Sequence, residues 1–257
     1  MFTESFLTVN GCKIRLHRGG QGAPLLYLHG VNGAGSVQPF MELLAKKYDV
    51  LVPEHPGFGV SDEPDWLDNI HDLAYFYLDL LDQLGLDQVE VVGSSLGGWL
   101  AMEMAIREPS RFKALVLVGS AGIRIAESKP GDIFLWSAET AARNTFHHPD
   151  MVAKALSAPV DLDTSLKNRH TAAKLAWEPR LHDPMLHKWL HRLKMPVQLI
   201  WGDKDAVMPL PHGHALKKLI PQSELIILTE CGHLPQLEAP QSFVDITTAF
   251  LEGASAQ

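Results

Sequence analysis

Cysteine is scarce in this chain of 257 residues: Cys12 and Cys231 lie far apart and form no CxxC or CxxxC pair. This spacing excludes a disulfide framework and a cysteine-ligated metal, and two isolated thiols are typical of a reducing compartment. Runs of Lys and Arg are also missing, and the formal net charge is −8, so the chain has no basic field to attract a phosphate backbone. We therefore do not expect nucleic-acid binding.

Long apolar runs are absent as well. None approaches the roughly 20 residues that a membrane-spanning helix needs, and the N-terminal sequence MFTESFLTVN has an acid where a signal peptide has a basic region. These absences predict a soluble, cytoplasmic protein that has no membrane partner. The hydrophobic content of 46% excludes a disordered chain, and it is sufficient for one large domain or for a core domain that carries an insertion.

Short apolar runs recur along the chain and predict strands. They lie at 6–9, 14–17, 25–28, 50–52, 89–92, 115–118, 197–201 and 225–228. Most are uninterrupted rather than alternating, which indicates strands covered on both faces of a largely parallel sheet. Between 25 and 118 they alternate with helical patterns. The clearest of these is an i, i+3, i+4 stripe over 70–84 that is closed by Gly85, and a second helix runs from the glycine-rich stretch after 92 to Glu108 and stops at Pro109. The alternation predicts right-handed βαβ units.

A helical insertion interrupts this alternation. From 123 to 193 the sequence shows helical stretches at 133–146, 150–157, 162–177 and 184–193, and no strand; the breaks fall at Pro130, Pro149, Pro159 and Pro179. We expect a core domain formed by residues 1–122 and 194–257, with a helical cap of residues 123–193 inserted between two of its strands. The closing residues GASAQ indicate a frayed tail.

The stretch VVGSSLGGWL at 91–100 contains a G-x-S-x-G pattern centred on Ser95. A serine at the apex of a sharp strand-to-helix turn has strained backbone, and glycines two positions before and after it let strand and helix approach without Cβ clashes. The N–H groups at the start of the following helix point to the same place and favour an oxyanion there. We therefore interpret Ser95 as a nucleophile, with a plain turn serine as the alternative.

A serine hydroxyl is a weak nucleophile unless a base, oriented by an acid, lies beside it. Of the 13 histidines, His233 in ECGHLPQ follows the last apolar run, where it would project over the same sheet edge as Ser95. Asp203 and Asp205, in IWGDKDAVMP, follow the preceding run. The resulting order Ser, Asp, His is the one associated with a G-x-S-x-G turn, and the spacing leaves both aspartates open as the acid.

On these motifs the chain resembles the α/β-hydrolase superfamily over nearly its whole length. The matching segments are His29-Gly30, HPGFGVSD at 55–62, the serine turn, WGDKD at 201–205 and CGH ending at His233. The resemblance implies the α/β-hydrolase fold: a mostly parallel eight-stranded sheet with helices on both faces and an inserted helical cap. It also implies His233 as the base and Asp205, the third residue after Gly in W-G-x-x-D, as the acid, which makes Asp203 a turn residue.

The same resemblance implies an oxyanion hole formed by the backbone N–H groups of Val31 and Leu96. The loop reads HGVNGAG and departs from the HGGG pattern of lipases, which argues against bulky lipid substrates and makes Asn32 a candidate contact of the substrate. On the insertion, Trp136 and Phe146, with Trp177 and Trp189, either line an apolar pocket above Ser95 or fix the insertion to the core.

Together these residues predict transfer of an acyl group to water, on a small or medium carboxylic ester or lactone, without cofactor or metal. A second hypothesis is C–C bond hydrolysis of ring-cleavage dienoates. Family members with that activity typically have HGxGPG, and a Trp after the catalytic histidine where this chain has Leu234. A third, non-enzymatic hypothesis is a small-molecule receptor on the same fold. An aspartate nucleophile, as in dehalogenases and epoxide hydrolases, is excluded by Ser95. The expected partner is a small-molecule substrate, and a homodimer is left open.

Overall fold

One sheet of eight strands organises the computed structural model of the chain, which describes residues 1–255. The strands are β1 (Thr3–Val9), β2 (Cys12–Gly19), β3 (Ala23–Leu28), β4 (Tyr48–Pro53), β5 (Val89–Ser94), β6 (Phe112–Val118), β7 (Val197–Gly202) and β8 (Glu224–Leu228). Their spatial order is β1-β2-β4-β3-β5-β6-β7-β8, in which β2 runs antiparallel to both neighbours and the other pairs are parallel. Each predicted apolar run lies within one of these strands, so the predicted sheet is confirmed.

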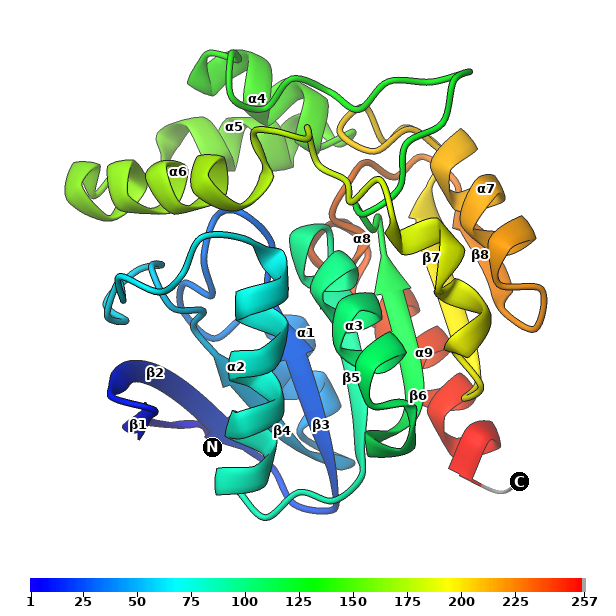
Figure 1. Cartoon of the computed structure of the whole chain (residues 1–257). Coiled ribbons are helices and arrows are strands. Elements are labelled where there is room, and N and C mark those ends of the chain that lie inside the picture. Colours follow the sequence, from blue (N-terminus) through cyan, green and yellow to red (C-terminus); the bar gives the residue numbers. More distant parts are fainter. Residues whose placement is uncertain (256–257) are drawn as a thin grey trace.

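Helices cover both faces of the sheet (Figure 1). The helices of the core are α1 (Pro39–Leu44), α2 (Ile70–Gln83), α3 (Leu96–Arg107), α7 (Pro211–Leu219), α8 (Pro235–Glu238) and α9 (Pro240–Ser255), and a 3₁₀ turn η1 (Pro109–Arg111) follows α3. Apolar side chains of α2, α3 and α7 pack in one hydrophobic cluster, and those of α1 and α9 pack in a second cluster on the opposite face. Because both faces are covered, every residue of the central strands β5 and β7 is buried, including the polar Glu90 and Gln198.

The predicted start and end of α2 follow from local chemistry. The side chain of Asn69 accepts hydrogen bonds from the backbone N–H groups of His71 and Asp72, which caps the first turn. At the other end, Gly85 has a φ of 65°, in the left-handed region that favours glycine.

The insertion between β6 and β7 contributes α4 (Ala138–Thr145), α5 (Pro149–Ser157) and α6 (Leu162–Ala176), which lie above the carboxyl ends of the strands (Figure 1). The predicted helix at 133–146 begins too early, and the predicted helix at 184–193 is wrong. Ser137 caps the first turn of α4 by accepting from the Thr140 N–H, so the helix begins at Ala138, and 133–135 forms a turn instead. The stretch 184–193 forms two 3₁₀ turns, η2 (Leu186–Lys188) and η3 (Leu190–Arg192), because it closes i to i+3 hydrogen bonds.

The chain leaves the sheet and returns to it at adjacent positions. Gly122 and His182 form a β-bridge, with hydrogen bonds from Gly122 N–H to the Leu181 carbonyl (3.0 Å) and from Asp183 N–H to the Gly122 carbonyl (3.1 Å). This neck joins the insertion to the core close to the predicted boundaries at 123 and 193, which stay a prediction.

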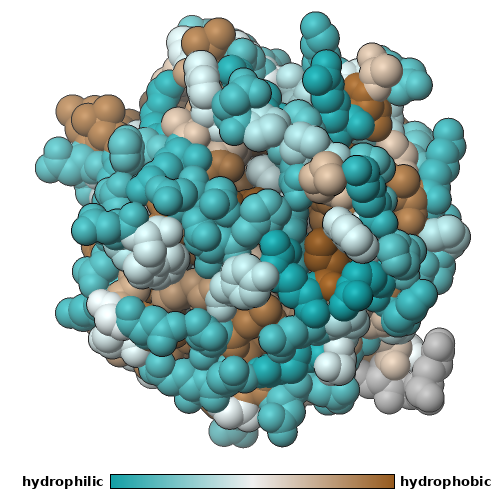
Figure 2. Space-filling model, in the orientation of Figure 1, coloured by the Kyte–Doolittle hydropathy of each residue, from teal (hydrophilic) through white to brown (hydrophobic). Residues whose placement is uncertain are grey.

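At the C-terminus, residues 253–255 belong to α9, so the prediction of a frayed tail is wrong for them; residues 256–257 lie outside the described residues. Within residues 1–255, no helix has the length and apolar content needed to cross a lipid bilayer. Figure 2 shows one face of the molecule as mainly hydrophilic, with hydrophobic residues in small separate patches.

Candidate active site

Ser95 occupies the sharp turn between β5 and α3. Its backbone angles, φ 56° and ψ −113°, are strained for a residue with a side chain, and its N–H donates to the Val118 carbonyl of β6 (2.8 Å). The flanking glycines allow the close packing that this turn requires. A Cβ atom on Gly93 would lie 2.4 Å from the Gly97 carbonyl oxygen, and one on Gly97 would lie 2.1 Å from the Leu28 carbonyl oxygen. The strand, turn and helix predicted from G-x-S-x-G are therefore present.

His233 and Asp205 meet at the same edge of the sheet. The distance from His233 Nδ1 to Asp205 Oδ2 is 2.8 Å, and both residues are buried. The second carboxylate oxygen of Asp205 accepts from the N–H groups of Val207 (2.9 Å) and Met208 (2.8 Å), which fixes its orientation. Since a carboxylate only accepts, the proton of a neutral His233 resides on Nδ1, and Nε2 is left as a proton acceptor.

Asp203, the alternative acid, faces elsewhere. Its carboxylate contacts Lys204 Nζ at 3.1 Å and accepts from the Cys231 N–H at 3.4 Å. Desolvation is the largest single effect on its pKa and raises it. The contacts together outweigh desolvation, so the pKa of the Asp203 carboxyl is lowered. Of the two aspartates, Asp205 is thus the one in contact with the imidazole.

Ser95 and His233 both border the segment that follows β6. The Ser95 carbonyl accepts from the Ala121 N–H of this segment (3.1 Å), and a Cβ atom on Gly119 would lie 3.0 Å from His233 Nδ1. Within residues 1–255, Ser95 Oγ and His233 Nε2 form no direct hydrogen bond. In enzymes without substrate such bonds are often long and shorten on binding.

The proposed oxyanion donors belong to the residue after Ser95 and to the loop that starts beside it. Leu96 is the first residue of α3, so its N–H has no partner within the helix. Within the described residues, the Val31 N–H donates to no backbone carbonyl. The start of its loop lies against the serine, because a Cβ atom on Gly30 would be 3.3 Å from Ser95 Cβ and 3.8 Å from Ser95 Oγ. The preceding His29 is neutral, since burial lowers its pKa to about 3, and its Nδ1–H donates to the Gly30 carbonyl (2.7 Å).

The remaining predicted contacts lie in different places. Trp136 packs against the core, with its ring over Gly131, whose N–H donates to the Val207 carbonyl two residues after Asp205 (2.7 Å). Phe146 lines a cavity of about 340 Å³ formed by α4 and α5, and none of the proposed catalytic residues lines it. The Asn32 side chain is exposed, and Trp177 and Trp189 are largely on the surface.

A clamp between the His233 loop and the insertion was not predicted from the sequence. The Glu238 carboxylate accepts from the N–H groups of Gly232 (2.7 Å), His147 (2.8 Å) and His148 (2.9 Å), and the His233 N–H donates to the Thr145 carbonyl (2.8 Å). The start of α5 is therefore fixed to the loop that carries the imidazole. No sequence signal marks this contact, because Glu238 lies 90 residues from its partner His148.

One group among the described residues has metal-ligand geometry: His71, Glu103 and Asp183. Arg107 already occupies the position of a cation there, because its Nη atoms lie 2.6 Å from Glu103 Oε2 and 2.7 Å from His71 Nδ1. The group is therefore better described as an ion-pair network that joins α2, α3 and the neck of the insertion.

A mostly parallel sheet, a strained serine at a strand-to-helix turn and a His–Asp pair at the same edge define a protein of the α/β-hydrolase class. The chain belongs to this family: the model of the α/β hydrolase fold matches residues 23–240.

Similar proteins include enzymes that act on different bonds. The chain is 27% identical to a 2-hydroxymuconate semialdehyde hydrolase of Pseudomonas sp. (strain CF600), over 96% of this chain and 93% of that protein. It is 29% identical to Lipase 1 of Psychrobacter immobilis, over 92% of this chain and 79% of the lipase. Among solved structures, a bacterial membrane phospholipase A has the same fold, with a TM-score of 0.85, 22% identity, and coverage of 100% of this chain and 87% of that one. The family is thus shown, and the substrate is left open.

Proposed function

We propose that the chain is a serine hydrolase that cleaves a small or medium carboxylic ester or lactone through an acyl-enzyme on Ser95. The observation that carries this proposal is the pairing of the strained Ser95 turn with the His233–Asp205 hydrogen bond of 2.8 Å at one edge of the sheet. A small-molecule receptor on this fold has no physical need for that combination.

In the proposed mechanism, Ser95 Oγ attacks the carbonyl carbon while His233 Nε2 accepts its proton. Asp205 stabilises the resulting imidazolium, and the N–H groups of Val31 and Leu96 stabilise the oxyanion. The C–O bond then breaks, and His233 donates its proton to the departing alcohol. Water, activated by the same imidazole, releases the acid and restores Ser95.

Labelling with a fluorophosphonate followed by peptide mapping tests the proposal. We expect covalent modification at Ser95 in the wild type and none in Ser95→Ala, together with Ser95-dependent turnover of p-nitrophenyl esters of short acyl length. Modification at another residue, or ester turnover that persists in Ser95→Ala, would reject the assignment.

A second candidate, C–C bond hydrolysis of a ring-cleavage dienoate, is favoured by the similarity to the 2-hydroxymuconate semialdehyde hydrolase over 96% of the chain. We prefer ester hydrolysis as the proposed function because Leu234 follows His233, where dienoate hydrolases typically have Trp. One assay distinguishes ester hydrolysis from dienoate hydrolysis. If the protein removes the yellow dienoate absorbance with a kcat/KM above that for the esters, dienoate hydrolysis replaces ester hydrolysis as the proposed function. Both activities depend on Ser95.

A further inference from the structure

The loop VNGAG at 31–35, which follows Gly30, is held by side chains from two distant parts of the chain. Asn168 on α6 donates from Nδ2 to the Asn32 carbonyl at 2.9 Å. Arg15 on β2 donates from Nη2 to the Gly35 carbonyl at 3.2 Å. The loop is therefore tethered on both sides of its central glycine.

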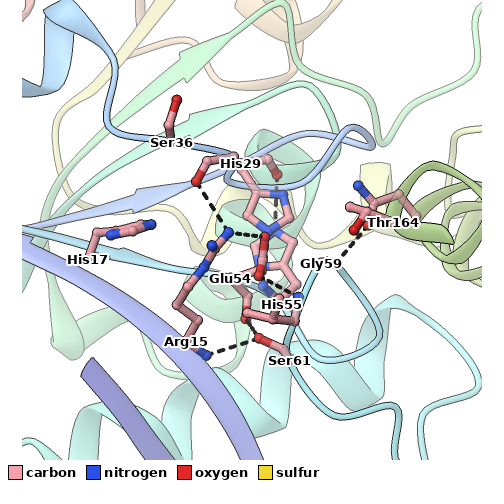
Figure 3. Close-up of polar contacts among 12 residues, drawn as sticks. Arg15, His17, His29, Ser36, Glu54, His55, Gly59, Ser61 and Thr164 are labelled. Carbon is pink, nitrogen blue, oxygen red and sulfur yellow. Dashed lines mark hydrogen bonds and ion pairs between the residues drawn. The ribbon is translucent and has the colours of Figure 1, made fainter. Parts of the chain in front are cut away.

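The two tethers are connected to each other through the turn that follows β4. The Asn168 Oδ1 atom accepts from the Gly59 N–H at 2.8 Å, and the Glu54 carboxylate accepts from the next N–H, that of Val60, at 3.0 Å. Glu54 in turn forms an ion pair with Arg15 at 2.8 Å, as Figure 3 shows from the labelled Arg15 and Glu54 side chains. A closed set of hydrogen bonds thus surrounds the loop.

Burial makes this arrangement stiff. Glu54 is 1% exposed and Asn168 is 7% exposed, so neither can exchange these partners for water without cost. The space around Gly33, in the middle of the loop, is also filled. A Cβ atom on Gly33, whose φ is 86°, would lie 2.9 Å from Asn168 Nδ2 and 3.6 Å from Glu54 Oε1.

From this geometry we infer that Asn168 is a positioning residue for the oxyanion hole: it fixes the loop that carries the Val31 N–H beside Ser95. Asparagine suits this place because its amide donates from Nδ2 to one loop and accepts at Oδ1 from the other at the same time, whereas a carboxylate only accepts. The inference rests on the proposed function. Because Asn168 lies on α6, the insertion would then help to form the oxyanion hole and would also limit the access of substrates to Ser95.

Two variants test it, with a matched control on the same helix. Asn168→Ala removes both hydrogen bonds, and Asn168→Asp keeps an acceptor for the Gly59 N–H but loses the donor to the Asn32 carbonyl. We expect kcat on a p-nitrophenyl ester to fall by about 10- to 100-fold in both, with KM changed by less than about twofold, because a displaced donor weakens the transition state more than the bound substrate. Affinity for a trifluoromethyl ketone, which forms a tetrahedral oxyanion with a serine, should weaken by the same factor.

The control is Thr171→Val, one turn further along α6. Thr171 donates to the Gly57 carbonyl at 2.6 Å and does not reach the 31–35 loop, so its loss loosens α6 without releasing the proposed donor. We expect a similar decrease in melting temperature and a kcat within about twofold of the wild type. Equal losses of kcat in Asn168→Ala and Thr171→Val would overturn the inference, as would ketone affinity unchanged in both Asn168 variants.

The failure of this inference can be distinguished from failure of the proposed function. If wild-type Ser95 is labelled by the fluorophosphonate and the Asn168→Asp variant is labelled at the same rate, the positioning role is wrong and the serine hydrolase stands. If the wild type is not labelled at Ser95, the proposed function falls, and the oxyanion role of Asn168 falls with it.

Discussion

Replacing Asp205 by Asn changes one heavy atom of the His233–Asp205 pair and tests the proposed role of Asp205 directly. The oxygen of the new amide has two possible positions. Next to the N–H groups of Val207 and Met208 it keeps two hydrogen bonds, of 2.9 and 2.8 Å in the wild type, whereas a flipped amide would place its NH₂ against these two donors. Each lost bond to a buried donor costs about 1–3 kcal/mol, so the first position is preferred by about 2–6 kcal/mol.

The preferred amide turns its NH₂ towards His233 Nδ1, which must then accept, and the imidazole proton moves to Nε2. In that tautomer Nε2 cannot take the proton from Ser95. At about 1.4 kcal/mol for each factor of ten, the active tautomer becomes rarer by between about 30-fold and about 10⁴-fold, and kcat should fall by a factor in this range. The assay is turnover of p-nitrophenyl acetate at neutral pH, normalised to the folded fraction by circular dichroism.

Asp203→Asn is the matched control, because that carboxylate contacts Lys204 and the Cys231 N–H rather than the imidazole. We expect its kcat to stay within about threefold of the wild type. If Asp205→Asn retains more than a tenth of the wild-type kcat, or if Asp203→Asn loses more than Asp205→Asn, the assignment of Asp205 as the acid is refuted.

Two further predictions concern stability. Ser95→Gly should raise the free energy of unfolding by about 1 kcal/mol in urea, because glycine relieves the strain at φ 56° while abolishing turnover. Ser94→Gly should lower it, because that serine accepts from Gln236 Nε2 (3.0 Å) in unstrained strand, and a stabilised Ser94→Gly would contradict the strain argument. The second stability prediction concerns His71. The hydrogen bond to Glu103 is the largest cause that raises its pKa above 6.5, and the raising effects together outweigh the lowering effects of desolvation and of the nearby Arg107 guanidinium. The contribution of protonated His71 to the free energy of unfolding is fully present below about pH 6.5 and is lost as pH rises through the higher folded-state pKa. The wild type should therefore lose its stability advantage over His71→Gln between about pH 5.5 and pH 8.5. A pH-independent difference in urea midpoint would show that His71 keeps one charge state.

Local sequence patterns predicted the sheet well, because each signal lies within the element that it describes. An uninterrupted apolar run such as 115–118 in β6 is suited to burial on both faces whatever its neighbours are. The insertion was predicted less well. Its segment 184–193 buries Leu186, Leu190 and Leu193, a spacing that an α-helix and consecutive 3₁₀ turns both satisfy, so periodicity could not separate them.

The sequence by itself determined the strand-to-helix turn at Ser95, since glycine at 93 and 97 is a short-range steric requirement that the printed residues satisfy. Spacing alone left both aspartates open, because both follow β7 within three residues, and the resemblance implied Asp205. Only the tertiary structure shows that the Asp205 carboxylate touches His233 and that of Asp203 does not. Asn168 could not be found from the sequence for a related reason: it looks like an ordinary polar residue of a helix, and its two partners lie 136 and 109 residues away. Contacts of that kind depend on where the whole insertion packs, and no local pattern encodes them.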